Sequence, residues 1–356
     1  MALPSTAFRP AVGPAFALAL AIGTAGGAVF AWFAMPLAWM LGAMSGVGLA
    51  AILRLPVRGW IRARPPMSAV IGTMLGVQFG PETLSAASQW WPALIALAAY
   101  LLIAGTLSNI YLRRVVRLDP ATAFFSAMPG GLIDMVLLGA ERGGDDRTIA
   151  LMHSSRIFLV VLGLPPLMTL VTGASAVAQA AEWRPLTAMS ASDAAWFLLT
   201  LAAGIVFGRL ARLPAPYLIG PMCVSMVLHW SGLSGFTVPS IVIILAQIVL
   251  GTTIGCRFAG VAPTRILSIL AVSAGATLIL LLTAVGFASG LSPILDVPAE
   301  GLLLAFSPGG LAEMSLVALA LNLEVAFVVT CHAARIIMVV AAAGLISKAR
   351  HPAGKN

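Results

Sequence analysis

The chain has 356 residues, of which 60% are hydrophobic and only 9% are charged, and its mean hydropathy is +1.03. Soluble domains carry about 25% charged residues, so this composition excludes a water-soluble globule of this length. The net charge of +8 comes mainly from arginines in short loops, a pattern typical of membrane orientation and not of a nucleic-acid-binding face. Long segments rich in Leu, Ala and Val, without period-two alternation, predict an all-α polytopic membrane protein and argue against a barrel.

Apolar segments recur along the whole chain and are separated by short loops. In the first half they cover 12–34, 36–53, 67–80, 90–112, 120–140 and 148–171. In the second half they cover 194–211, 214–230, 237–256, 265–289, 299–320 and 323–346. The first segment is long enough to be a retained helix and not a cleaved signal peptide. Because a span needs about 20 residues, we expect roughly ten to twelve spans, with short segments tilted or re-entrant.

A motif in the segment 120–140 returns in the segment 299–320 at an offset of 179 residues. The stretch MPGGLIDM at 128–135 matches SPGGLAEM at 307–314 without a gap. Downstream, the sequence HSSR at 153–156 matches HAAR at 332–335 at the same offset. Matches elsewhere extend the similarity over nearly the whole chain. We therefore predict a first membrane repeat at 12–171, a linker at 172–192 and a second membrane repeat at 193–346.

The loop arginines indicate how the two repeats are oriented. They follow the second and fourth segments in the first half, but the first and third segments in the second half. The positive side thus switches relative to the repeat, as expected of an inverted repeat about a pseudo-two-fold axis. Lys348, Arg350 and Lys355 favour the opposite placement of the C-terminal end, which leaves a parallel arrangement as the alternative.

Each repeat carries a Pro-Gly-Gly triplet inside an apolar segment, where it is expected to break the helix. The triplets are Pro129, Gly130 and Gly131 in the first repeat and Pro308, Gly309 and Gly310 in the second. Backbone amides freed at the start of a half-helix carry positive partial charge and suit an anion. A kink that serves packing alone is the alternative interpretation.

Acidic, basic and imidazole side chains follow each triplet at matching positions. Asp134 and Glu313 are candidate proton or sodium sites, or members of structural ion pairs with arginine. Arg156 and Arg335 can hold an anionic solute, or can equally clamp those two acids. His153 and His332 share a helix face with these arginines and can shuttle protons, although a buried histidine is often only a hydrogen-bonded core residue.

No pattern in the sequence indicates an enzyme, a metal site or a cofactor. Cys223, Cys256 and Cys331 have no metal-binding spacing and lie in apolar runs. There is no phosphate-binding GxxxxGK[ST] loop, no HExxH zinc motif and no GxSxG nucleophile motif. We therefore predict no catalytic residues, and a solvated turn at 141–147.

The paired PGG-x-x-[DE]-M and HxxR motifs resemble those of the membrane AbrB family, and the resemblance covers about residues 14–346. The resemblance implies a duplicated membrane domain. Members of that family are labelled as AbrB-type regulators of gene expression or as ammonia monooxygenases. Neither label gains support from these residues, because a soluble DNA-binding domain and a copper or iron ligand cluster are both missing from the sequence. The family also resembles, more distantly, inverted-repeat transporters with broken helices.

The function predicted from the sequence is that of a secondary transporter in the bacterial inner membrane. Alternating access would move a small anionic solute, coupled to a proton or sodium ion, past broken helices that meet near the midplane. The alternative is a membrane-embedded regulator or sensor that acts through a partner without transport. A membrane oxygenase with bound metal is the third hypothesis. Besides the bilayer, solute and coupling ion, we expect no nucleic-acid partner, and the glycine content allows packing within or between chains.

Overall fold

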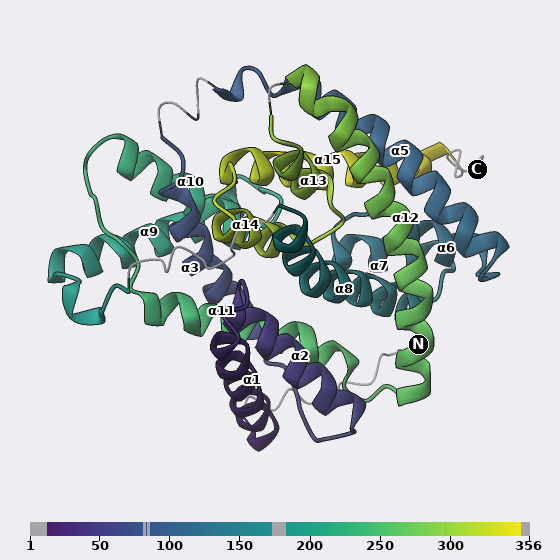
Figure 1. Ribbon diagram of the computed structural model, residues 1–356, viewed down its shortest axis with the longest axis horizontal. Helices are drawn as coiled ribbons and strands as arrows, with labels where there is room; N and C mark the ends of the chain where they lie inside the picture. Colours follow the sequence, from purple (N-terminus) through teal and green to yellow (C-terminus); the bar gives the residue numbers. More distant parts are fainter. Residues whose placement is uncertain (1–12, 81–82, 84–85, 173–182, 296, 350–356) are drawn as a thin grey trace, which may run out of the picture.

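The computed structural model describes residues 13–80, 83, 86–172, 183–295 and 297–349, and within these ranges it contains helices and no strands (Figure 1). Among the described residues, seven helices are long and apolar enough to cross a membrane. They are α1 (Pro14–Trp32), α5 (Trp91–Arg114), α8 (Asp146–Thr172), α9 (Ala191–Leu210), α11 (Ser240–Gly255), α12 (Pro263–Leu295) and α15 (Val325–Ala349). The predicted all-α polytopic membrane class is confirmed. The expected ten to twelve spans exceed this number, because several apolar segments form shorter helices.

The shorter helices include two pairs that are interrupted at the Pro-Gly-Gly triplets. The helices α6 (Pro120–Ala127) and α7 (Leu132–Glu141) flank the first triplet, and α13 (Ala299–Phe306) and α14 (Leu311–Ala320) flank the second. Every bound of the second pair lies 179 residues after its counterpart in the first. The predicted helix breaks are therefore confirmed. The remaining short helices are α2 (Ala38–Ile52), α3 (Arg64–Gly76) and α10 (Pro216–Trp230), with 3₁₀ turns at Ile61–Ala63, Leu186–Ala188 and Cys256–Phe258. Of the predicted linker, residues 173–182 lie outside the described ranges.

Two helical groups at the periphery are built on glycine contacts. In one, α1 packs on α2, and Gly26 faces the carbonyl group of Gly42 so closely that a Cβ atom would overlap it. In the other, α9 packs on α10, and Gly204 and Gly220 face each other in the same way. Both contacts lie at equivalent positions of the two halves. Small residues are what allow membrane helices to approach at backbone distance.

Helices from opposite halves of the chain complete these two groups. The helix α3 of the first half packs against α10 of the second, where Gly72 faces the backbone of Leu218. In the same way α11 of the second half packs against α2 of the first, where Gly251 faces the backbone of Met40. Figure 1 shows α3 beside α10, which packs on both α3 and α9, and α11 beside α1 and α2. The two halves therefore exchange helices and do not fold as separate bodies.

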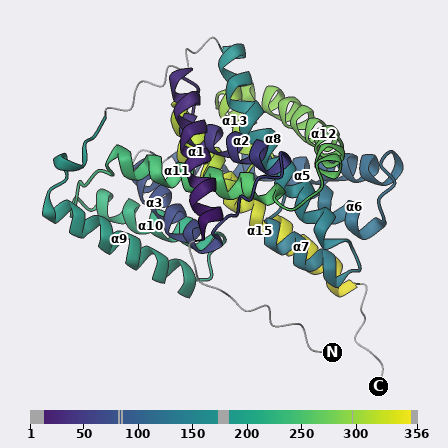
Figure 2. The ribbon, with the colours of Figure 1, turned by 90° about the horizontal axis from the view of Figure 1, so that it is seen from below.

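The helices α5 and α12, which are the fourth long segments of their halves, run antiparallel. The hydroxyl group of Tyr100 donates to the carbonyl oxygen of Leu280 at 3.3 Å, whereas Tyr111, further along α5, contacts Gly275, which comes earlier in α12. Figure 2 gives a second view of these elements, with α5 and α12 on the same side of the molecule. An inverted repeat requires such opposite directions for equivalent helices. The inverted repeat itself stays a prediction, and this packing favours it.

The helices α6 and α7 fold back on each other as a hairpin, with the Pro-Gly-Gly triplet at the turn. Phe125 in α6 lies beside Gly139 in α7, and the backbone of Thr122 lies beside Gly144 just after α7. The amide of Asp145 donates to the Thr122 hydroxyl oxygen at 2.8 Å. The segment 120–140 is thus broken at the triplet, as predicted, and its two half-helices lie side by side. The extended backbone of Met128–Gly131 reverses the chain, so both ends of the segment lie on one side.

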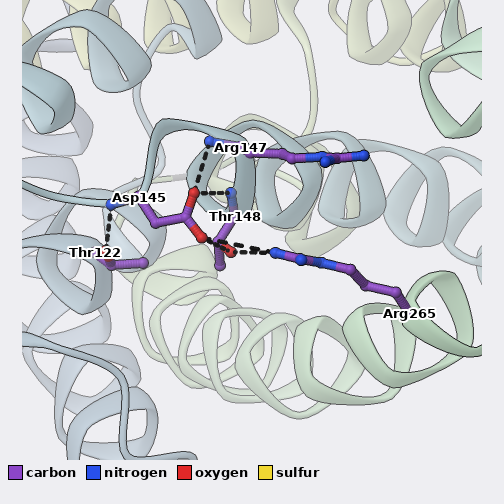
Figure 3. Close-up of polar contacts among 5 residues, drawn as sticks. All are labelled: Thr122, Asp145, Arg147, Thr148 and Arg265. Atoms are coloured by element: carbon purple, nitrogen blue, oxygen red, sulfur yellow. Dashed lines mark hydrogen bonds and ion pairs between the residues drawn. The ribbon is translucent and has the colours of Figure 1, made fainter. Parts of the chain in front are cut away.

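One polar cluster ties this end of the hairpin to α8 and α12 (Figure 3). An Oδ1 atom of Asp145 accepts hydrogen bonds from the amides of Arg147 and Thr148 at 3.1 and 3.2 Å and so caps α8. The other oxygen accepts from the Thr148 hydroxyl at 2.5 Å and lies 3.7 Å from Nη2 of Arg265, at the start of α12. The hydrogen bond from the Thr148 side chain outweighs partial desolvation and, with the backbone bonds and the charge of Arg265, lowers the pKa of Asp145.

Candidate functional site: two arginines at the Pro-Gly-Gly turns

Arg335, in the middle of α15, binds the carbonyl groups that the second helix break exposes. Its Nη1 atom donates to the carbonyl oxygen of Ser307, and its Nη2 atom donates to that of Gly309 at 2.6 Å. A carbonyl at the end of a helix has no partner in the next turn, and inside the membrane it has no water either. The planar guanidinium satisfies both groups at once. Arg335 is therefore the residue that makes the break tolerable at this depth.

Arg156, at the equivalent position of α8, does the same at the first break. Its Nη1 atom lies 3.4 Å from the carbonyl oxygen of Ser126 and 3.3 Å from that of Met128. Its Nη2 atom donates to Nδ1 of His153 at 2.7 Å. The Nε2 atom of His153 in turn lies 2.8 Å from the carbonyl oxygen of Phe125. Because Nδ1 accepts a hydrogen bond, Nε2 must carry the proton and act as the donor.

The second histidine is held differently. The Nδ1 atom of His332 donates to the carbonyl oxygen of Val328 at 3.0 Å, and its Nε2 atom is buried without a hydrogen-bond partner among the described residues. The carbonyl of Leu304, which is equivalent to that of Phe125, accepts instead from the hydroxyl of Ser307 at 2.8 Å. A serine in place of Met128 thus leaves His332 with one free nitrogen. Of the two predicted proton shuttles, only this one has an uncommitted ring atom.

The charges of Arg156 and Arg335 lie within electrostatic range of the same buried side chain, Tyr100. The two arginines are 5% and 3% exposed, and Tyr100 is fully buried between α5 and α12. Neither arginine forms an ion pair with a carboxylate within the described ranges, and both Nε atoms are buried without a partner. Two buried cations that share a neighbourhood but lack an acid form a site suited to an anion.

Asp134 and Glu313 do not pair with Arg156 and Arg335, although the sequence allowed those arginines to clamp them. Glu313 is 2% exposed, and its Oε1 atom lies 3.8 Å from Nη2 of Arg64 in α3. Asp134 is half-buried and forms no ion pair with a described residue. Both carboxylates turn back towards the glycine that precedes their own half-helix. That placement stabilises a negative charge through the amino-terminal end of the helix dipole.

A family model described as "Transition state regulatory protein AbrB" matches residues 39–350 of this chain. The chain belongs to the AbrB family. An uncharacterized Bacillus subtilis (strain 168) protein, YhjN, is 28% identical over 355 residues, covering 90% of this chain and 89% of its own length. A protein named as a regulator, AbrB, from Escherichia coli (strain K12) is 28% identical over 309 residues, covering 85% of this chain and 86% of its own. The resemblance inferred from the paired motifs is thereby confirmed.

Three residues of this AbrB-family chain belong to the site but were missed in the sequence. In the sequence Tyr100 is one aromatic residue among many in apolar segments. The signal that could have singled it out is that the chain has only three tyrosines. Arg64 and Arg257 were assigned to loops that orient the chain. In the structure Arg257 donates from Nη1 to the hydroxyl of Ser154 at 3.2 Å and also lies within electrostatic range of Glu313. Only the packing of α3 against α14, and of α11 against α8, gives these arginines a role.

The cysteines and acids of this AbrB-family chain form no cluster of three or more potential metal ligands within the described residues. Cys331 is buried, and Cys223 and Cys256 are partly buried, all with free thiols. The predicted triplets, the two acids and the two histidines all lie at or next to the helix breaks. The site is thus built from backbone carbonyls, guanidinium groups and half-helix ends.

Proposed function

We propose that this multi-pass membrane protein is a secondary transporter of a small anionic solute. The observation that carries the proposal is that Arg156 and Arg335 are both buried, each with an Nε atom that has no partner, and that neither has an acidic partner in the described ranges. Removing a cation from water costs several kcal/mol unless it is compensated. The carbonyl groups of the two breaks compensate part of that cost. An anion that binds between the arginines would compensate the rest.

The half-helices add a second source of attraction for an anion. The helices α7 and α14 begin directly after the carbonyls that the arginines hold, and neither has a side-chain cap at its first glycine. Amides at such a start carry positive partial charge and bind anions. These helix ends already face the carboxylates of Asp134 and Glu313, so an anion would be held chiefly by the guanidinium Nε atoms, with the helix-end amides as the weaker contribution. In a region of low dielectric constant each of these interactions is strong. No covalent chemistry is needed, and we propose no catalytic activity.

Transport against a gradient needs a coupling ion, and the acids at the half-helix starts are the groups that can bind one. Asp134 and Glu313 are the candidates, and His332 has a ring nitrogen that could take part in proton transfer. We further propose that the chain lies in the bacterial inner membrane, and its arginine-rich loops support an orientation with the end of α5 towards the cytoplasm.

The experiment that tests the proposal is anion-dependent stabilisation of the purified protein. A ligand that binds only the folded state stabilises it by about 2.7 kcal/mol at 100 times its Kd. Acetate, succinate, phosphate and sulfate would be compared at constant ionic strength, with thermal unfolding in detergent as the readout. We expect one class of anion to raise the melting temperature. A hit would then be tested for uptake into proteoliposomes under a proton or sodium gradient.

Variants of the two arginines make this test specific. Arg156→Gln and Arg335→Gln remove the charge but keep an amide that can donate to a break carbonyl, so folding should survive. Arg113→Gln, at the exposed end of α5, is the matched control. Loss of stabilisation in the first two variants and not in the control would support the proposal. Retention of anion binding at wild-type affinity in both site variants would end it.

A regulatory role without transport is the second candidate, and the family description and the name of the Escherichia coli relative favour it. In that case the arginines would only hold the helix breaks, and the output would pass through a partner. Transcript profiles of cells that carry Arg335→Gln would then change although no tested anion binds the wild-type protein. Anion-dependent uptake by the purified protein alone would argue against this candidate.

A further inference from the structure

The two half-helices after the triplets differ in their surroundings although they are equivalent in sequence position. In α14, Glu313 is 2% exposed and Leu316 is 1% exposed. In α7, the residue equivalent to Leu316 is Leu137, which is 58% exposed, and its neighbour Ile133 is 69% exposed. Asp134, the equivalent of Glu313, is only half-buried. The half-helix α14 is therefore enclosed, whereas α7 presents an apolar face and an acid at the periphery.

The enclosure of α14 comes from the peripheral helices. Besides α13 and α15, α14 packs against α3 and α8, whereas the main neighbours of α7 are only α8 and α6. Arg64 reaches from the start of α3 to Glu313 at 3.8 Å. Arg257, directly after α11, donates to the Ser154 hydroxyl on α8 at 3.2 Å. Its charge lies within range of Arg64, which repels it, and of Glu313, which attracts it. We refer to Arg64, Arg257 and Glu313 as the latch.

We propose that the structure is one of two end states, and that in the other state α11 covers α7 as α3 now covers α14. The proposal rests on the transporter function above and on the predicted inverted repeat. If the halves are equivalent and opposite, an exchange of the two hairpin environments would open the arginine site to the other side of the membrane. The exposed Ile133 and Leu137 would then be the surface that α11 buries. The latch would have to separate during each cycle.

The latch has no counterpart at the first hairpin. At the offset of 179, Ile243 in α11 stands where α3 has Arg64, and Gln78 stands where Arg257 follows α11. Asp134 would therefore meet an isoleucine and an amide in the exchanged state. The observed state gains an ion pair that the other state lacks. We infer that the latch sets the resting state, and that removing it shifts the population towards the exchanged state.

Cross-linking tests this without any substrate. The three native cysteines would be replaced, and Asp134→Cys would be combined with Ile243→Cys, the pair equivalent to Glu313 and Arg64. A short bifunctional methanethiosulfonate reagent would be applied to membranes, with each single-cysteine variant as a labelling control. The pair would be measured with the latch intact and with Glu313→Gln. We expect a low yield of intramolecular cross-link with the latch and a severalfold higher yield without it.

Arg64→Gln removes the cation of the same ion pair. It would be used in place of Glu313→Gln if the Glu313 variant fails to fold. The inference is overturned if both single cysteines react but the pair never cross-links in either background. It is also overturned if the yield is equal with and without the latch. These outcomes leave the transporter proposal standing on anion binding. Conversely, a latch-dependent cross-link in a protein that binds no anion would establish the two states and reject the transport function.

Discussion

The Nη2 atom of Arg335 lies 2.6 Å from the carbonyl oxygen of Gly309, a residue 26 positions earlier in the chain. This contact, with its partner at Ser307, closes the second helix break from a different helix. The equivalent contact of Arg156 with Met128 closes the first. In both halves the HxxR motif thus serves the Pro-Gly-Gly motif directly. The two motifs form one unit, which explains why they recur together at a fixed offset.

Replacing Arg335 with alanine should destabilise the protein markedly. Two buried carbonyl oxygens lose their donor, and each unsatisfied group costs about 1–3 kcal/mol. Arg335→Lys should cost less, because an ammonium group can still reach one carbonyl. Arg147→Ala is the control, since its side chain is exposed at the start of α8. Thermal unfolding in detergent measures the difference. Equal melting temperatures for Arg335→Ala and Arg147→Ala would contradict the role assigned to Arg335.

A methyl group at Gly26 should separate α1 from α2. The Cβ atom of alanine would overlap the backbone of Gly42, and overpacking of this kind costs about 1–3 kcal/mol. Gly286→Ala and Gly290→Ala in α12 are matched controls, because nothing lies within 4 Å of either added atom. Unfolding of the three variants would be compared in the same detergent. If a control were as destabilised as Gly26→Ala, the loss of stability could not be attributed to overlap between α1 and α2.

Acid should weaken the cluster around Asp145. Its pKa is lowered from 3.8, chiefly by the Thr148 hydroxyl, so its stabilising contribution is fully present above the unfolded-state pKa. That contribution is lost as the pH falls below about 4 towards the lowered pKa of the folded state. We expect wild type to be more stable than Asp145→Asn at pH 6 and the two to converge near pH 3. A constant difference over this range would exclude ionisation of Asp145 as the cause.

Single cysteines at Gly144 and Leu323 should be accessible from opposite sides of the membrane. These residues follow α7 and α14 and are equivalent at the offset of 179. The antiparallel packing of α5 and α12 favours the inverted arrangement on which this expectation depends. Labelling of intact cells with an impermeant thiol reagent, in a background without native cysteines, gives the answer. Labelling of both positions, or of neither, would instead support parallel repeats.

Tyr100→Phe should weaken anion binding while leaving most of the stability intact. The hydroxyl lies near both arginines and donates to Leu280, so its loss changes the polar surroundings of the proposed site. A single hydrogen bond contributes about 0.5–1.5 kcal/mol, and a similar loss of binding energy is expected. Tyr111→Phe, further along α5, provides a comparison. Anion titrations followed by thermal shift would distinguish the two, and equal effects would place Tyr100 outside the site.

The membrane class, most segment limits and the positions of both helix breaks could be predicted from the amino-acid sequence. These follow from local properties, because apolar length sets a span and Pro129 with two glycines cannot continue a helix. The offset of 179 also paired Asp134 with Glu313 and Arg156 with Arg335 without reference to any contact. Local patterns sufficed wherever the physical cause lay within one segment.

The partners of these residues, in contrast, follow from how the helices pack in three dimensions. The sequence allowed Arg335 to pair with Glu313. In the fold Arg335 instead donates hydrogen bonds to the carbonyl oxygens of the helix break, and Glu313 pairs with Arg64. The segment 120–140 also forms a hairpin, whose ends are joined by the hydrogen bond from the amide of Asp145 to the hydroxyl of Thr122. Each of these outcomes depends on helices from distant parts of the chain arriving together. A buried charge takes the nearest group that satisfies it, and that distance is set by packing and not by sequence spacing.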